Sequence, residues 1–270
     1  STSSWSLNTR IMGQKGLQIT SGAQLGANSW WDSNSRFGPT DNSEYDYNYQ
    51  SWAWRRSAGF TTVAYEGDGN MPRQIAHDLG PNNVPEMIWI KHRELGTGST
   101  ARNWMCYHKG LNGGTNPSHY YVNLNNENVQ VNEDRIFNDT EPTSTHFTVG
   151  DHENVNTDGK NYIALLFSSV SGISKCGYYD GSNSGVSLTT GFQPRFLIIR
   201  RITGSQNARW TVFDTLRGLG TTSQSALFLD ATESQSGVGN IVTTSSTGFS
   251  VAHNSNVSQD NDKYVYYAHA

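Results

Sequence analysis

Residues 146–167 read HFTVGDHENVNTDGKNYIALLF, and residues 248–268 read GFSVAHNSNVSQDNDKYVYYA. Matching residues recur at a constant distance of 102 positions, as Phe147 and Phe249 do. Aromatic residues, an Asn and an Asp are repeated at the same spacing in both stretches. One segment is therefore present twice in this chain.

The match continues upstream with small insertions and deletions. PEMIWIKHR at 85–93 corresponds to PRFLIIRRI at 194–202, and RNWMCYHKGL at 102–111 corresponds to RWTVFDTLRGL at 209–219. The repeated unit spans about a hundred residues, which is longer than the roughly 20–50 residues of a solenoid repeat. The pair thus indicates a duplicated domain, and duplication favours binding or assembly because a catalytic site is seldom needed twice.

Both copies are dominated by short runs rich in Val, Ile, Tyr, Phe and Trp that end at Gly, Asn, Asp or Pro, which is the pattern of β-strands. The run YIALLF at 162–167 is apolar on both faces and is expected to be a central strand. Asp158-Gly159 and Asp260-Asn261 precede the last strand of each copy, where residues that tolerate positive φ are expected to close a tight hairpin. We predict strands at 61–65, 87–92, 104–107, 120–124, 147–149, 162–168, 175–179, 196–201, 210–214, 226–230, 249–251 and 264–268.

About six short strands per hundred residues is the spacing of a β-sandwich. We therefore predict an all-β fold with two tandem β-sandwich repeats, at 59–170 and 171–270. Residues 1–58 have little strand periodicity and are expected to form an irregular aromatic-rich N-terminal arm, or the end of a preceding fibre module. The sequence starts without an initiator Met or a signal pattern, which predicts a processed product or an ordered fragment.

The arm contains the candidate ligand-binding residues Trp30, Trp31, Trp52 and Trp54, which stand among Ser, Asn and Asp. One interpretation is that these rings fill a seam in the fold or between subunits. The other is that they bind sugars, because the flat apolar face of a sugar can stack on an aromatic ring with polar neighbours. Arg55 and the arginine after it mark the expected junction with the first repeat.

The composition excludes several classes of protein. Charged residues make up 16% of the chain, the net charge is −4 and the pI is about 6.0, so there is no basic surface of the kind that binds nucleic acid. No run of about 18 apolar residues exists, so membrane insertion is not expected.

Signatures of enzymes and cofactor sites are missing from the sequence. It contains no GxSxG, P-loop, HExxH, CxxC or dinucleotide motif, so we expect no catalytic residues, no cofactor and no enzymatic activity. Asp151, Glu153 and Asp158 form the richest acidic cluster, which is interpreted either as a calcium site or as a solvated turn. The second copy has fewer acids at these positions, which favours the turn, and no metal is expected.

Basic residues follow an apolar strand in both copies. Lys91, His92 and Arg93 correspond to Arg200 and Arg201. Charged residues at strand ends usually protect a sheet edge from aberrant pairing, and this is the role we expect here. A weak contact with an anion such as a lipopolysaccharide phosphate is the alternative.

Two further pairs of residues are interpreted structurally. Cys106 and Cys176 fall at non-equivalent positions of the two copies, so buried free thiols are expected, although a disulfide stays open. Trp104 and Trp210 occupy one repeated position and are expected to anchor the core.

The motifs also resemble a known family. The chain is similar over about residues 50–270 to a repeated C-terminal domain of large virion proteins from marine tailed bacteriophages, including those of cyanobacteria. The strings that carry the resemblance are SWAWRRSAGFTTVAYEGDG (51–69), NVPEMIWIKHR (83–93), NWMCYHKGLNGGTNP (103–117), FNDTEPTSTHFTVG (137–150) and YIALLFSSVSGISKCGYYDGSNS (162–184).

The resemblance implies a virion structural protein, a tail-fibre or capsid-fibre component that mediates adhesion to the host surface. It would be assembled in the cytoplasm of the bacterial host and act outside the cell as part of the virion. The implied partners are other virion proteins, further copies of the chain, with a homotrimer favoured, and a glycan of the host cell surface. The alternatives are a capsid decoration or vertex protein and, in another class, a glycan-cleaving depolymerase, which would need two carboxyl groups roughly 5–9.5 Å apart.

Overall fold

The computed structural model describes residues 5–12, 15–20, 24–27, 51–94, 102–204 and 208–270. Their fold is all-β, and the two largest sheets each contain six antiparallel strands. The first has the order β4 (Phe60–Glu66), β11 (Asn161–Phe167), β6 (Met87–His92), β7 (Met105–His108), β8 (Tyr120–Asn123) and β9 (Val131–Asn132). The second has the order β12 (Ser174–Asp180), β20 (Lys263–His269), β14 (Phe196–Arg201), β15 (Trp210–Asp214), β16 (Ser225–Phe228) and β17 (Ser236–Gly237).

A smaller sheet contributes to the outer core of each large sheet. Each outer core joins apolar residues of the small and the large sheet, such as Val149 with Leu166 and Val251 with Leu197. The small sheets are formed by β5 (Arg73–Ala76) with β10 (His146–Val149), and by β13 (Val186–Thr189) with β19 (Gly248–Val251) and β18 (Val242–Ser245). In the described residues, helical structure is limited to α1 (Asp134–Phe137) and the 3-10 turns η1 (Arg10–Met12), η4 (Leu111–Gly114), η5 (Pro117–His119) and η6 (Thr215–Arg217).

The large sheets of the two repeats have the same strand order and the same register. Tyr162 of β11 pairs with Tyr65 of β4 in the first sheet, and Tyr264 of β20 pairs with Tyr179 of β12 in the second. The two tyrosine pairs also stack alike, with ring centroids 5.2 Å apart in both. Aligned residues of the sequence thus fall on equivalent strands, as the duplication predicts.

The central strands are buried on both faces because they are sandwiched between two cores. In β11, Ile163 and Leu165 face a core between the two large sheets, whereas Ala164 and Leu166 face the outer core of the first repeat. The second sheet contributes residues such as Ile198 to the core between the sheets. The two repeats therefore share one apolar interior in addition to their own outer cores.

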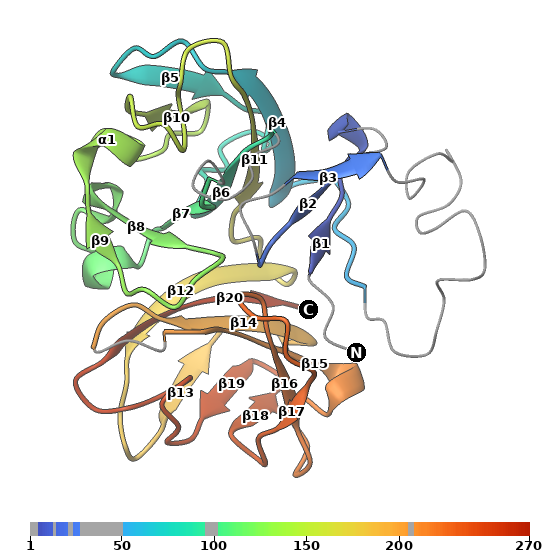
Figure 1. Cartoon of the computed structure of the whole chain (residues 1–270). Coiled ribbons are helices and arrows are strands. Elements are labelled where there is room, and N and C mark those ends of the chain that lie inside the picture. Colours follow the sequence, from blue (N-terminus) through green and yellow to red (C-terminus); the bar gives the residue numbers. More distant parts are fainter. Residues whose placement is uncertain (1–4, 13–14, 21–23, 28–50, 95–101, 205–207) are drawn as a thin grey trace.

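The N-terminal arm contains a small sheet of its own, formed by β1 (Ser6–Leu7), β2 (Lys15–Gln18) and β3 (Gln24–Ala27). Figure 1 shows these strands beside the place where the two large sheets meet. Met12, Leu17 and Ile19 of the arm belong to the shared core. The regular strand structure of the arm is a finding that the sequence pattern did not predict.

The turns before β11 and β20 have the expected positive φ, which is 66° at Gly159 and 68° at Asn261. Glycine and asparagine tolerate this left-handed region better than most residues. The expected hairpins are wrong, because the chain crosses at these turns from a small sheet to a large one: β10 pairs with β5 and β19 with β13 and β18, whereas β11 and β20 pair with strands of the large sheets. In the described part of the chain, no helix is long and apolar enough to cross a membrane.

Candidate functional site

The arm and the two repeats meet in a zone that we call the aromatic seam, which contains Trp5, Trp52, Trp54, Trp104 and Trp210. Trp104 and Trp210 lie directly before β7 and at the start of β15, and both are buried in the shared core. Their expected role as core anchors is confirmed.

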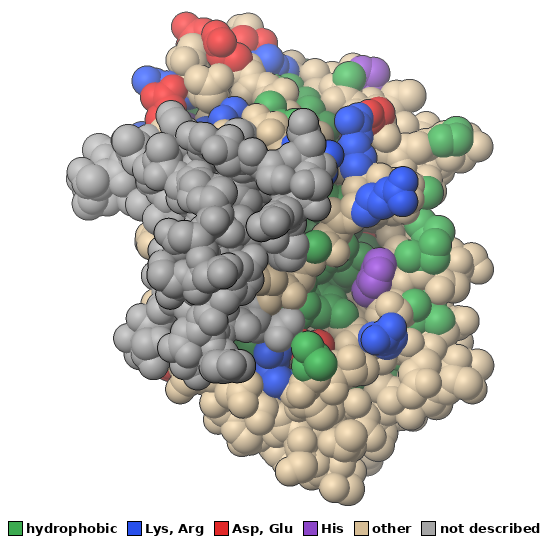
Figure 2. Space-filling model, turned by 90° about the vertical axis from the view of Figure 1, so that its right-hand side faces the viewer, with side chains coloured by type: hydrophobic (Ala, Val, Ile, Leu, Met, Phe, Trp, Pro, Cys, Tyr) green, Lys and Arg blue, Asp and Glu red, His purple; other side chains and the backbone are tan. Residues whose placement is uncertain are grey.

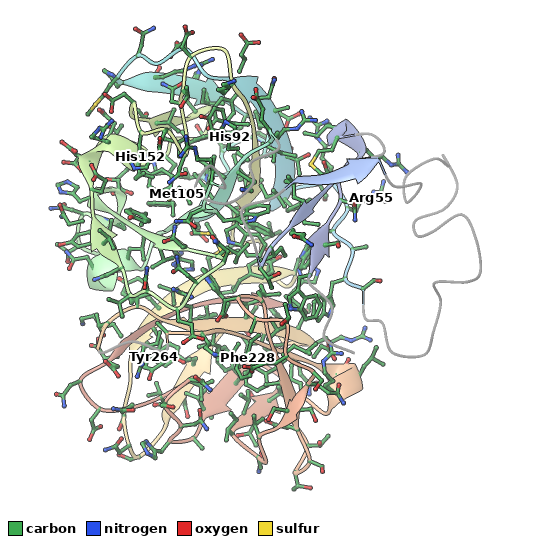
Figure 3. The ribbon with its side chains drawn as sticks, viewed as in Figure 1. Arg55, His92, Met105, His152, Phe228 and Tyr264 are labelled. Atoms are coloured by element: carbon green, nitrogen blue, oxygen red, sulfur yellow. The ribbon has the colours of Figure 1, made fainter. Side chains whose placement is uncertain are left out.

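Three of these indoles connect the three parts of the chain in a cycle. In each case the indole N–H donates a hydrogen bond to a backbone carbonyl of another part. The pairs are Trp5 of the arm to Phe228 of the second repeat at 2.8 Å, Trp104 of the first repeat to Gln18 of the arm at 2.9 Å, and Trp210 of the second repeat to Asn123 of the first at 2.8 Å. Each part is thus bonded to the next, and the cycle closes. Figure 3 labels Phe228 in the second repeat.

Trp52 is enclosed by neighbours from the arm and the second repeat. It stacks on Trp5 with centroids 5.2 Å apart, and the Arg217 guanidinium lies 5.3 Å from its ring centroid. Its indole N–H donates a hydrogen bond to the Asp214 carboxylate at 2.9 Å. The ring centroid of Phe196 lies 5.4 Å from that of Trp52. These contacts use the ring for packing, which is the seam interpretation of the sequence.

Trp54 is half-buried and lies among phenylalanines of both repeats. Its ring centroid is 5.4 Å from that of Phe196 and 6.2 Å from that of Phe167, with nearly perpendicular planes in both cases. The ring of Phe60 lies 6.3 Å away. Trp54 therefore keeps some exposed ring surface, and sugar binding at this residue stays a prediction. The other two candidates, Trp30 and Trp31, lie outside the described residues.

The expectation that Lys91, His92, Arg200 and Arg201 protect sheet edges is wrong. Both β6 and β14 are central strands, flanked on each side by another strand. The side chains of Lys91 and Arg200 are completely buried. Two apolar cores enclose these strands, so a charged side chain at this position points into the protein.

Backbone carbonyls hold the buried cations in place. Arg200 donates from Nη1 to the carbonyl of Asn126 at 3.1 Å and from Nη2 to that of Asn128, and its guanidinium lies 5.0 Å from the Trp210 ring centroid. Burial lowers its pKa to about 10. Lys91 donates to the carbonyl of Arg102, and burial together with the charge of Arg102 lowers the pKa of Lys91 to about 7.

A buried histidine connects the two repeats. His108, at the end of β7, lies 3.1 Å from the carbonyl of Tyr266 through Nε2, and its Nδ1 accepts a hydrogen bond from the backbone N–H of Gly110 at 3.0 Å. These partners require a neutral ring, and burial lowers the pKa of His108 to about 4. The geometry suits a structural contact between repeats.

The acidic loop before β11 is engaged in ion pairs. Asp151 pairs with Arg135 at 2.7 Å, and Glu153 pairs with Arg102 at 2.6 Å. Among the residues that the structure describes, no group of three or more His, Cys, Asp and Glu side chains is placed to hold a metal ion.

Cys106 and Cys176 are free and fully buried. Burial raises the pKa of both thiols, so neither has the character of a reactive nucleophile. The expectation of two buried thiols is confirmed.

The sequence analysis missed the roles of Asp214 and His108. Both are the last residue of the strand that begins at or next to the repeated tryptophan, and both make contacts to another part of the chain. Their alignment with each other was the available signal, but a polar residue at the end of a strand is more often at the surface. Only the packing of one repeat on the other gives these residues their partners.

These observations define the chain as an all-β protein with two sandwich repeats closed around an aromatic seam. A family model described as a domain of unknown function (DUF7483) matches residues 17–270, so the chain belongs to that family. Neither a curated protein nor a solved structure matches the chain.

Proposed function

We propose that the chain is a structural component of a bacteriophage virion, a tail-fibre or capsid-fibre module that attaches to the host surface. The support comes from the resemblance of its motifs to those of virion proteins of marine tailed phages. The shared strings include β6, β7 and β11, which contribute Trp89, Cys106 and Phe167 to the core between the repeats. The resemblance thus covers the residues that build the fold.

The core between the repeats is the observation that carries a structural role. It joins both large sheets and the arm in one apolar interior. The buried polar groups around it are used for internal contacts, as in the hydrogen bonds of Arg200 and His108 to backbone carbonyls. Such an arrangement supports a rigid module that carries a binding surface.

Glycan cleavage is the alternative from another class. It requires a pair of carboxyl groups roughly 5–9.5 Å apart beside the substrate. Several described carboxylates are already engaged: Glu86 with Lys109, Glu141 with the Tyr107 hydroxyl and Asp214 with Arg217. This engagement supports binding without turnover.

Immunogold labelling tests the virion role. Antibodies raised against the purified chain are applied to phage particles isolated from a lysate of the bacterial host. Label on fibres supports the proposal, label over the capsid shell supports the decoration or vertex alternative, and unlabelled particles contradict both. Release of reducing ends from host-envelope polysaccharide, abolished by one carboxylate substitution, would favour the depolymerase.

A homotrimer remains our proposal for the assembly, because phage fibres and vertex spikes are commonly three-fold. Trp52 and Trp54 give it no support, since residues of this chain pack against both rings. Sedimentation of the full chain at micromolar concentration tests it. A trimer supports the proposal, and a monomer contradicts it.

A further inference from the structure

The arm reproduces the central part of the repeated unit. Trp5 precedes β1 as Trp104 precedes β7, and both indoles take part in the same cycle of hydrogen bonds. The strand pairing also agrees residue for residue. The first set of equivalent pairs is Ser6 with Gln18 in the arm, Met105 with Asn123 in the first repeat and Thr211 with Phe228 in the second. The next set, one residue further along the strand, is Leu7 with Leu17, Cys106 with Val122 and Val212 with Leu227, in the same order.

The end of the arm matches the end of a repeat. A bridge between Ser57 and Phe60 precedes β4, as a bridge between Val170 and Ser174 precedes β12. Trp54 stands three residues before the first bridge, and Phe167 stands three residues before the second. Trp54 thus takes the place in the arm that Phe167 has in the first repeat.

The described part of the arm contains fewer strands than the large sheet of a repeat. In the first sheet, β6 separates β7 from β11, which places those strands about 9.6 Å apart at the usual spacing of about 4.8 Å between neighbours. In the arm, Trp5 and Trp52 stack directly at 5.2 Å. The described part of the arm forms one sheet of three strands, whereas the large sheet of each repeat has six strands.

Trp5, Trp52 and Trp54 of the arm pack against the core that the two repeats share. Figure 2 shows the face of the molecule on this side, where hydrophobic side chains lie in a hollow and Lys and Arg side chains lie around it. Arg55 and the C-terminus lie on the same side in the other views (Figures 1 and 3). We use the name seam surface for the group formed by Trp54, Phe60, Ile173, Arg195, Leu216 and His269.

Backbone contacts show that Leu216, Arg195, His269 and Ile173 are neighbours, and the Trp54 ring lies against Phe60 and against Phe196, which is next to Arg195. The N–H of Thr215, next to Leu216, donates to the carbonyl of Arg195 at 3.0 Å, and the N–H of Arg195 donates to the carbonyl of His269 at 2.8 Å. Ala270 donates to the carbonyl of Ile173 at 2.9 Å.

The seam surface combines exposed apolar groups with positive charge. Leu216 is 81% exposed and Ile173 is 46% exposed, whereas Trp54, Phe60 and His269 are half-buried. Arg195 is exposed, as is Arg55 beside Trp54.

The nearby acidic groups are already neutralised. Asp214 is paired with Arg217 and accepts the Trp52 indole N–H, and Asp78 is paired with Arg56. The surface is thus complementary to an anion that also has an apolar face.

We propose that the described part of the arm is a third copy of the central strands of the repeated unit and that the seam surface beside it binds an acidic saccharide. The partly exposed Trp54 ring provides a stacking platform for the apolar face of a sugar. Arg55 and Arg195 provide charge-assisted hydrogen bonds to its carboxylate groups. This inference rests on the proposed function, because an acidic host-surface polysaccharide is the natural source of such a ligand.

Binding of the full chain to polygalacturonate, with neutral dextran as the reference polymer, is the test. Isothermal titration calorimetry is expected to detect binding to polygalacturonate only, and the affinity should fall as salt is raised. The double variant Arg55→Gln, Arg195→Gln should bind at least tenfold more weakly. Trp54→Phe, which keeps an aromatic ring in the seam, should weaken binding severalfold.

Arg135→Gln is the matched control, because it removes an exposed arginine charge on α1, away from the seam surface. It should bind like the unchanged chain, and thermal melts should show that all variants are folded. Equal binding to the two polymers, no binding to either, or equal affinities of the double variant and the control would overturn the inference.

The inference and the proposed function can fail separately. If labelled particles and host-cell binding are observed but polygalacturonate is not bound, the virion role stands and the saccharide site is refuted. If polygalacturonate is bound through Arg55 and Arg195 but particles are unlabelled, the site stands and the virion role is refuted.

Discussion

Lys91 and Arg200 occupy one repeated position and differ in how they tolerate burial. A lysine can lose its proton when it is desolvated, whereas an arginine keeps its charge and needs acceptors. The pKa values follow this difference, since that of Lys91 is lowered to about 7 and that of Arg200 to about 10. The contributions of Lys91 and Arg200 to the free energy of unfolding therefore depend differently on pH.

We expect the stability contribution of Lys91 to increase between pH 7 and pH 10.5. Its pKa is about 7 in the folded chain and 10.5 as a model value, so the unfolded chain binds more protons in this range. The free energy of unfolding then rises with pH by up to about 1.4 kcal/mol per pH unit. Urea unfolding of Lys91→Met and the unchanged chain measures the difference, which should grow across this range; a constant difference would contradict the lowered pKa.

Replacing Arg200 should be more harmful than replacing Lys91. Arg200→Met leaves the carbonyls of Asn126 and Asn128 without their guanidinium donor. A hydrogen bond to a charged group contributes about 1.5–3 kcal/mol, so we expect a loss of about 3 kcal/mol from the two bonds. Chemical unfolding at pH 9 compares Arg200→Met with Lys91→Met. Equal losses would show that the two carbonyl contacts add nothing to stability.

At the scale of elements, the indole cycle ties each tryptophan-bearing strand to another part of the chain. Its three hydrogen bonds have similar lengths, between 2.8 and 2.9 Å, although they join different parts. The bonds to Gln18 and Asn123 are shielded in the shared core. The bond of Trp5 is nearer the surface, because its ring is only half-buried.

Substitution by phenylalanine removes the N–H of an indole and part of its volume. We expect Trp104→Phe and Trp210→Phe to lower the free energy of unfolding by about 2–4 kcal/mol each, from the lost hydrogen bond and the cavity left behind. Trp5→Phe should cost less. The measurement is urea unfolding followed by far-UV circular dichroism. A larger loss in Trp5→Phe than in the other two would contradict the burial argument.

At the scale of the whole molecule, the shared core makes the repeats dependent on each other. The ring centroid of Trp89 in the first repeat lies 6.2 Å from that of Trp210 in the second, and the ring centroids of Phe167 and Tyr267 are 5.2 Å apart. Unfolding one repeat would expose this apolar surface of the other, at a cost that scales with the area. The boundary predicted at residue 170 separates two copies in sequence, but both copies share this interior.

The full chain should consequently unfold in one cooperative transition. Differential scanning calorimetry should show a single peak whose calorimetric and van't Hoff enthalpies agree. Far-UV and near-UV circular dichroism should give the same midpoint, because secondary structure and the tryptophan packing are lost together. Two resolved peaks would show that the repeats are stable separately.

Much of the fold could be predicted from local patterns. The duplication and the β-rich runs identified the strands that bear Trp104, Tyr162 and their equivalents, because strand formation depends on residues close together in sequence. The small sheet of the arm was missed. Its strands β1 and β2 have two and four residues, and such short strands carry too little periodicity to be recognised.

The candidate site depended on contacts between distant segments. A strand that is apolar on both faces, such as β11, does not reveal which face meets its own repeat and which meets the other. Trp52 reaches Asp214 across 162 positions, and Trp210 reaches Asn123 across 87. These partners are set by the packing of the two sheets and the arm around one core, and burial in that packing is also what turns Lys91 and Arg200 from expected edge charges into internal hydrogen-bond donors.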